Sequence, residues 1–138
     1  DKNFLKQLQQ ESIINYSFTG GSNSLLQIST NSFIGSLNLI GPNKRINIII
    51  GMLKEKKPIE CIKLLSRIAK RIYLTEVPNP RSFNPITVAE ELKNKKISYV
   101  SNNEIASLLS NEEDYIVTGS IYLIGSLIKR RYVRIKIN

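Results

Sequence analysis

From position 46 onward, short continuous apolar runs alternate with segments whose apolar residues recur at helical spacing. The continuous runs, rich in β-branched residues, predict buried strands at 46–50, 72–74, 97–100 and 115–118. Alternating strands and helices favour a mainly parallel sheet with helices on both faces, a Rossmann-like α/β fold. In such sheets ligands bind beyond the carboxyl ends of the strands.

The intervening segments carry helix-start signals. Pro58 is suited to a first helical position, where its missing N–H group costs nothing. The apolar stripe predicted for that helix comprises Ile59, Ile62, Leu65, Ile68 and Ala69. Asn84 followed by Pro85 predicts a capped second helix. The capping-box pattern Ser-Asn-Asn-Glu at 101–104 predicts a third helix, which continues through Leu109.

The segment 115–125 carries the strongest local signal. It predicts a buried strand, a break at Gly119 and Ser120, and a helix with apolar residues at helical spacing. Backbone N–H groups at a helix N-terminus favour anionic ligands. An ordinary strand–helix unit that uses glycine for its tight turn is the alternative.

The first part of the chain has weaker patterns. Residues 4–14 predict a short helix, and residues 15–33 predict two or three short strands, supported by the alternation of Leu26 and Ile28. At the other end, alternation after Tyr132 predicts an edge strand with a basic outer face.

Bulk properties narrow the class of protein. A chain of 138 residues is the size of one ordinary domain and is long enough for a core without disulfides. It contains no apolar run of the length that a membrane span needs. The single cysteine, Cys61, is expected to be a small buried side chain, which fits a reducing cytoplasm.

The formal net charge of +9 raises the question of a nucleic-acid partner. Isoleucine, asparagine and lysine dominate the composition, a bias typical of an AT-rich genome, and the lysines are not interleaved with aromatic residues. We therefore expect neither a nucleic-acid partner nor a membrane from composition.

Three segments occur in the order and spacing of a known family. They are Gly-Met-Leu at 51–53 followed by Glu-Lys-Lys at 55–57, Pro-Arg-Ser at 80–82, and Gly-Ser-Ile-Tyr at 119–122. Together they resemble the C-terminal domain of folylpolyglutamate synthase/dihydrofolate synthase, a branch of the Mur ligase superfamily. The resemblance covers residues 43–138 and implies a C-terminal glutamate-ligase-type α/β domain. Residues 1–42 would then be a β-rich remnant of the preceding central domain.

The resemblance implies an ATP-dependent ligase that adds glutamate to folate through an acyl phosphate, with ATP and Mg²⁺ as cofactors. The chain contains no Gly-x-x-x-x-Gly-Lys-[Ser/Thr] loop and no histidine, so the family's Asp-x-Ala-His-Asn-Pro motif is missing. We expect no binding site for ATP or Mg²⁺ in this chain, as if the ligase were truncated and internally deleted. The domain would then be inactive without a separate nucleotide-binding half.

Three positions match the family's substrate-binding residues, and the resemblance implies no catalytic or metal-binding residue here. Ser120 matches a hydroxyl near the amino-acid substrate, Arg81 a guanidinium suited to a carboxylate, and Lys56 the central lysine of an acidic-Lys-Asp triplet. The triplet ends in Lys57 instead of aspartate. Each residue also has a structural alternative: a helix cap for Ser120, an ion pair within the proline-rich loop for Arg81, and a solvated loop lysine for Lys56.

The residues leave two other functions open. The chain is alternatively a basic α/β module that binds RNA or an acidic partner, for which steep weakening with salt is the test. It is alternatively the product of a decaying gene without its own activity, in which case its first forty-odd residues should exchange amide hydrogens quickly.

Overall fold

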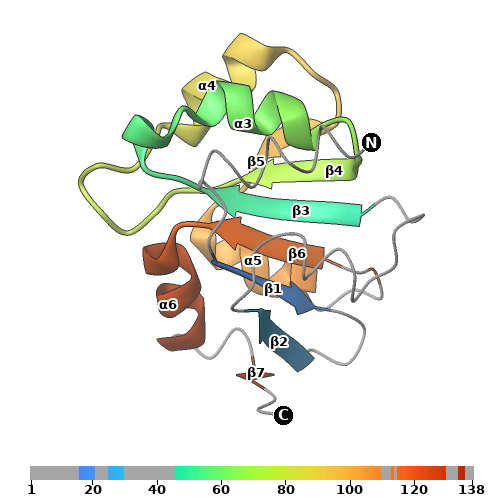
Figure 1. Ribbon diagram of the computed structural model, residues 1–138, viewed down its shortest axis with the longest axis vertical. Helices are drawn as coiled ribbons and strands as arrows, with labels where there is room; N and C mark the ends of the chain where they lie inside the picture. Colours follow the sequence, from blue (N-terminus) through green and yellow to red (C-terminus); the bar gives the residue numbers. More distant parts are fainter. Residues whose placement is uncertain are drawn as a thin grey trace.

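The computed structural model describes residues 16–20, 25–29, 46–109, 113, 115–129 and 134–135. Within these residues the strands form one sheet in the order β5-β4-β3-β6-β1-β2-β7 (Figure 1). The protein is therefore an α/β fold built on a mixed sheet, with its helices packed on the parallel part.

Four parallel strands make up the centre of this sheet. They are β3 (Ile46–Gly51), β4 (Ala69–Leu74), β5 (Ile97–Tyr99) and β6 (Tyr115–Gly119). β3 pairs in parallel with both β4 and β6, and β4 pairs in parallel with β5. Every residue of β3 is buried, as expected for a strand covered on both faces. The predicted mainly parallel α/β sheet is confirmed.

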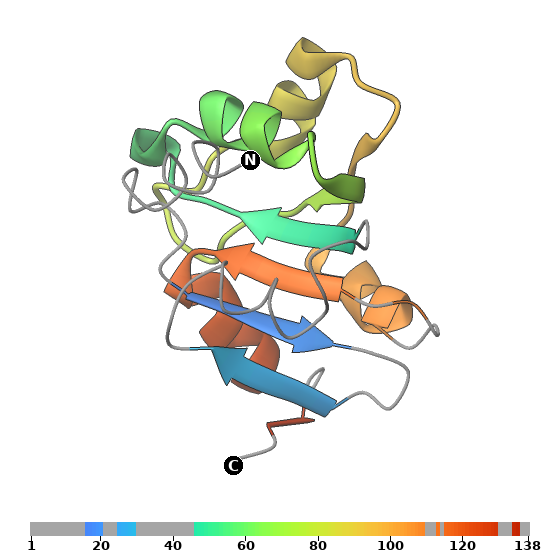
Figure 2. The same cartoon turned by 45° about the vertical axis from the view of Figure 1, so that its right-hand side comes forward.

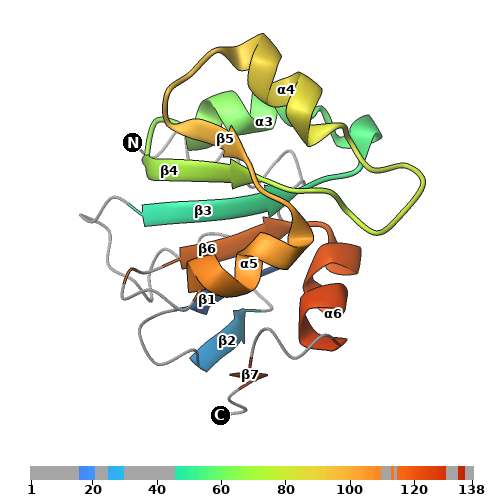
Figure 3. The same cartoon turned by 180° about the vertical axis from the view of Figure 1, so that it is seen from behind.

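Helices cover both faces of the parallel part, as predicted. α3 (Pro58–Leu65) and α4 (Pro85–Leu92) pack on the face that carries Ile48 and Ile50. α5 (Asn102–Leu109) and α6 (Ile121–Lys129) lie on the opposite face, in front of the sheet in Figure 3. Two apolar layers therefore enclose β3, one on each side.

The first helix is shorter than its apolar stripe predicted. α3 ends at Leu65, so the assignment of Ile68 and Ala69 to this helix is wrong. The N–H of Ile68 donates to the carbonyl of Leu65 at 3.1 Å, a three-residue spacing that closes a tight turn. Ala69 instead begins β4, three residues before the predicted strand. Apolar side chains on both sides of a turn imitate a continued helical stripe when they face the same core.

The helix starts read from sequence are confirmed for α4 and α5. The Asn84 side chain accepts hydrogen bonds from the N–H groups of Ile86 and Thr87, both at 3.1 Å. At α5 the Glu104 side chain accepts from the N–H of Ser101 at 3.0 Å, which is one half of a capping box. These local signals succeed because a cap involves only residues close in sequence.

Outside the parallel core, β1 (Tyr16–Gly20) pairs antiparallel with β6 and with β2 (Leu25–Ser29), as Figure 2 shows. The strand predicted around Leu26 and Ile28 is thereby confirmed. A short β7 (Arg134–Ile135) pairs with β2 at the end of the sheet, where the sequence predicted an edge strand. The predicted helix at 4–14 lies outside the described residues, and the division at residue 42 stays a prediction.

The structure also bears on two expectations drawn from composition, the burial of the single cysteine and the lack of a membrane span. Cys61 is buried in α3, as predicted for the single cysteine. Among the described residues, no helix has both the length and the apolar character that crossing a membrane requires.

Candidate functional site

The carboxyl ends of β3, β4 and β6 meet at one edge of the sheet, on the left in Figure 1. From β3 the chain proceeds outward through β4 to β5 on one side, and β6 then lies on the other side of β3. The strand order therefore reverses between β3 and β6, the position at which open α/β sheets bind ligands. All three segments singled out in the sequence follow these strand ends.

Two glycines bring the backbones together at this reversal. Gly51 pairs with Gly119, and the N–H of Ser120 donates to the carbonyl of Gly51 at 2.8 Å. Gly119 has a φ of 112°, and a Cβ there would lie 2.1 Å from the Gly51 carbonyl oxygen. Only glycine fits both the conformation and the close approach. The Gly-Ser turn is thus shaped by contact with β3.

The proline-rich loop, residues 75–84, is fixed to the connection that follows β3. The N–H of Lys54 donates to the carbonyl of Arg81 at 2.9 Å, and the N–H of Phe83 donates to that of Met52 at 2.8 Å. Leu53 and Ser82 form an isolated antiparallel bridge. The two segments are therefore held as one unit, although about thirty residues separate them in sequence.

Arg81 reaches the connection after β3 with its side chain as well. One guanidinium nitrogen, Nη1, donates to Oε1 of Glu55 at 2.8 Å, with more than half of the Arg81 side chain exposed. The ion-pair alternative for Arg81 is thus present, although the partner lies outside the proline-rich loop. A guanidinium carries five N–H donors, so this bond leaves Arg81 able to bind a second carboxylate.

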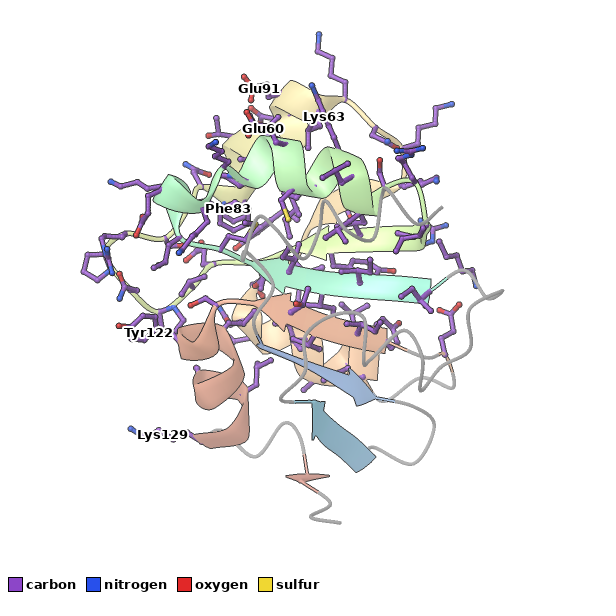
Figure 4. The ribbon with its side chains drawn as sticks, viewed as in Figure 1. Glu60, Lys63, Phe83, Glu91, Tyr122 and Lys129 are labelled. Atoms are coloured by element: carbon purple, nitrogen blue, oxygen red, sulfur yellow. The ribbon has the colours of Figure 1, made fainter. Side chains whose placement is uncertain are left out.

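Ser120 stands at the start of α6, where its hydroxyl oxygen accepts a hydrogen bond from the N–H of Tyr122 at 3.1 Å. The helix-cap alternative for Ser120 is therefore present in the structure, and a role toward a substrate stays a prediction. Tyr122, 48% exposed, projects from the first turn of α6 on the side where the strands end (Figure 4). The segment 119–122 was identified from the sequence, whereas the exposure of its aromatic ring is seen only in the structure.

Lys56 closes a short 3-10 helix, η1 (Lys54–Lys56), and is exposed. The next residue, Lys57, has a φ of 53°, a left-handed conformation, and stands at the N-cap of α3 without a side-chain cap. Lys56 thus shares its turn with Glu55, the partner of Arg81. Because Arg81 pairs with Glu55, Arg81 lies next to the turn that contains Lys56. Substrate binding by Lys56 stays a prediction.

The other side of this edge, at the ends of β4 and β5, is acidic. The Tyr99 hydroxyl donates to Oε1 of Glu76 at 3.4 Å, and the Asn102 side-chain amide donates to the Glu76 carbonyl at 3.2 Å. Partial burial, with Glu76 and Glu104 nearby, raises the pKa of Tyr99. The pKa of Glu104 is lowered because it accepts hydrogen bonds from Ser101.

Thr75, directly after β4, is fully buried, and its hydroxyl has no hydrogen-bond partner among the described residues. Its backbone N–H donates to the carbonyl of Ile50 at 3.0 Å, so Thr75 continues the pairing beside Gly51. No sequence signal distinguishes this threonine from an ordinary strand residue. Only the register of two parallel strands identifies it as a neighbour of the glycine turn.

No family model matches the chain, and no curated protein matches its sequence. Among solved structures, the chain is similar to folylpolyglutamate synthase from Thermotoga maritima, with a TM-score of 0.61 and 22% identity. The match covers 80% of this chain and 28% of that protein, so the chain spans well under half of its structural relative. This likeness shows a shared α/β fold.

The resemblance implies ATP and Mg²⁺ as cofactors, and the expectation that this chain lacks binding sites for them stays a prediction. Among the described residues, no group of three histidine, cysteine, aspartate or glutamate side chains suited to a metal ion occurs. The full sequence also lacks the glycine-rich loop with lysine that cradles a nucleotide's phosphates. What this edge does offer is cations on loops, which suit carboxylates, and the positive end of the α6 dipole. The N–H groups of Ser120, Tyr122 and Leu123 at that helix start already donate within the chain.

Proposed function

We propose that the chain is the amino-acid-binding domain of an ATP-dependent ligase of the folylpolyglutamate synthase type, which joins glutamate to a folate in the cytoplasm. The observation that carries this proposal is the convergence of three separate sequence segments. Residues 51–57, 80–82 and 119–122 follow different strands, yet lie at the reversal of strand order in a fold shared with such a ligase.

The chemistry of this edge suits a dicarboxylic amino acid. Arg81 offers a planar fork of donors for one carboxylate, and the start of α6 behind Ser120 offers a positive helix end for the other. Lys56 adds a nearby cation on the same turn as Glu55. Held by both carboxylates, glutamate would keep its amino group oriented for attack on an activated acid.

We propose that a separate nucleotide-binding half activates the folate carboxylate. This proposal is supported by the lack of a glycine-rich nucleotide-binding loop in the sequence. By itself the chain would bind glutamate and form no amide bond. Folate and glutamate are then the substrates of the assembled ligase.

A titration of the isotopically labelled chain with L-glutamate, followed by amide NMR shifts, tests the binding. We expect shifts at Gly51 and Ser120, and weaker ones with L-glutamine, which lacks one carboxylate. Arg81→Lys keeps the charge but loses the fork, so affinity should fall about tenfold, the effect of one charge-assisted hydrogen bond of about 1.5 kcal/mol. Arg67→Lys, at the opposite edge of the sheet, is the matched control and should leave the affinity unchanged.

An incorporation assay tests the ligase itself. The chain is mixed with a nucleotide-binding half of a folylpolyglutamate synthase, ATP, Mg²⁺, a reduced folate and labelled glutamate. Amide formation only in the complete mixture would support the proposal. Incorporation by the chain alone would contradict its dependence on a partner, and absence of both glutamate shifts and incorporation would overturn the assignment.

A further inference from the structure

The ion pair between Arg81 and Glu55 leaves hydrogen-bonding capacity on both side chains. Of the Arg81 guanidinium only Nη1 is engaged, at 2.8 Å from Oε1 of Glu55. Among the described residues, Nε and Nη2 of Arg81 have no acceptor and Oε2 of Glu55 has no donor. Nε and Nη2 form a fork that matches a carboxylate, and a carboxylate oxygen accepts from an ammonium. The pair therefore presents an unused fork of donors beside an unused acceptor.

The two side chains are both accessible and held in place. The exposed fraction of the side chain is 58% for Arg81 and 42% for Glu55, so a small ligand can reach both. The N–H of Arg81 donates to Oδ1 of Asn79 at 2.8 Å, and the carbonyl of Arg81 accepts from the N–H of Lys54 at 2.9 Å. Because the two backbones are joined directly, a ligand that binds here has little to order.

The negative charge of Glu55 stands among lysines. Lys54 and Lys56 flank it in η1 and Lys57 follows, all with exposed side chains. A turn that bound a plain anion would gain affinity by losing the carboxylate, because like charges repel. A cation and an anion held side by side suit a ligand that also carries both charges close together. An α-amino acid does so, with its ammonium and carboxylate on one carbon.

We propose that Arg81 and Glu55 bind the zwitterionic head of an α-amino acid. The α-carboxylate takes the Nε–Nη2 fork of Arg81, and the α-ammonium donates to Oε2 of Glu55. This inference rests on the proposed function and deepens it, because it explains how the site distinguishes an amino acid from a plain dicarboxylic acid. The side-chain carboxylate of glutamate is then left for the start of α6.

The test compares L-glutamate with glutarate, which has the same two carboxylates but no amino group. Both are titrated into the labelled chain at one ionic strength and followed by amide NMR shifts. Charge alone favours glutarate, which is doubly negative, at a turn with three lysines. We expect L-glutamate to bind about fivefold more tightly instead, the equivalent of about 1 kcal/mol, the upper value for an exposed ion pair.

Glu55→Gln keeps the size of the side chain and an acceptor oxygen for Arg81, but removes the charge. The affinity for L-glutamate should fall about fivefold, while the affinity for glutarate should stay equal or rise. A residue that only oriented Arg81 would change both affinities in the same direction. Glu55→Asp keeps the charge and should retain most of the preference for L-glutamate.

The matched control is Glu60→Gln, which makes the same change in net charge. Glu60 is exposed in the first turn of α3 and lies on the outer side of the helix layer in Figure 4. This variant should leave the ratio of the two affinities unchanged.

Three outcomes would overturn the inference while the proposed function stands. They are equal affinity of the unmodified chain for L-glutamate and glutarate, parallel weakening of both ligands in Glu55→Gln, and the same loss of preference in Glu60→Gln. Absence of shifts with either ligand would overturn the inference as well, and together with absence of incorporation it would overturn the ligase assignment.

Discussion

The two edges of the parallel sheet are built in different ways. At the carboxyl edge, loops are joined by backbone hydrogen bonds, such as Ser120 to Gly51 and Lys54 to Arg81, and charges of both signs lie close together. At the amino edge, where the parallel strands begin, side-chain links add to the backbone bond from the N–H of Ile72 to the carbonyl of Lys96: the Lys96 ammonium bridges two turns, and Lys70 pairs with Glu113. The edge proposed to hold a substrate thus depends more on backbone contacts between loops, and the other edge depends more on charged side chains.

This difference has a physical basis. Backbone contacts impose fixed distances and tolerate few substitutions, so they suit a site that must hold a small ligand in one orientation. Exposed charges are screened by salt and tolerate variation in position, so links between them fix the turns less rigidly. Variants at equivalent places on the two edges should consequently differ in how much they change the unfolding free energy and in how that change responds to salt.

The largest effect is expected for Gly119→Ala. The new Cβ would meet the Gly51 carbonyl oxygen at 2.1 Å, in a left-handed conformation that disfavours alanine. The free energy of unfolding should fall by at least about 3 kcal/mol in denaturant titrations. Gly125→Ala, within α6 where a Cβ meets nothing within 4 Å, is the control and should raise stability by about 0.5–1 kcal/mol. Equal effects would mean that the glycine contact does not shape this edge.

Lys96→Met removes the charged link of the amino edge while keeping the aliphatic side chain. Two backbone carbonyls lose their donor, so unfolding free energy should fall by about 2 kcal/mol. Lys95→Met, on the exposed neighbour, should change it by less than about 0.5 kcal/mol. A loss at Lys95 as large as at Lys96 would contradict a specific bracing role.

The sequence predicted most of what depends on near neighbours. The strand at 46–50, the cap at Asn84 and the capping box at 101–104 were identified because their signals lie within a few residues. The end of α3 was misplaced because Ile68 and Ala69 face the same core as the helix, and periodicity does not detect a tight turn.

Long-range pairings explain what was missed. The ion pair of Arg81 with Glu55 joins residues 26 positions apart, and the turn after α3 is joined to the turn after α4 by a contact across 30 positions. In both cases, nothing in the sequence of one segment indicates which distant segment it contacts. The buried hydroxyl of Thr75 was missed for the same reason, since its environment is set by strand register. Segment order still predicted which strand ends carry the candidate site, because parallel strands bring their carboxyl ends together.

Ser120→Ala separates the cap from the proposed substrate contact at the carboxyl edge. Loss of the hydrogen bond to the N–H of Tyr122 should lower unfolding free energy by about 1 kcal/mol. Ser120→Thr keeps a capping hydroxyl and should restore most of this stability. If Ser120 also contacts glutamate, the alanine variant should weaken glutamate binding measured by NMR under conditions where it is fully folded. Unchanged affinity in that variant would leave Ser120 as a cap alone.

The smallest effect is expected at acidic pH. There the loss of unfolding free energy with falling pH should respond to salt differently at the two edges. Glu113 at the amino edge and Glu104 at the carboxyl edge both have a pKa below the ordinary 4.5. A lowered pKa stabilises the fold above about pH 4.5, and that contribution is lost as pH falls through the lowered value. Glu113→Gln and Glu104→Gln should each make the unfolding free energy depend less on pH in denaturant titrations across acidic pH.

Salt then distinguishes the two carboxylates. The pKa of Glu113 is lowered mainly by the exposed Lys70 ammonium, so high salt should remove most of the difference between Glu113→Gln and the unmodified chain. The pKa of Glu104 is lowered mainly by the backbone N–H of Ser101, a contact of fixed geometry, so its difference should persist. Equal loss of both contributions in salt would contradict the contrast between an edge held by charge and an edge held by backbone geometry.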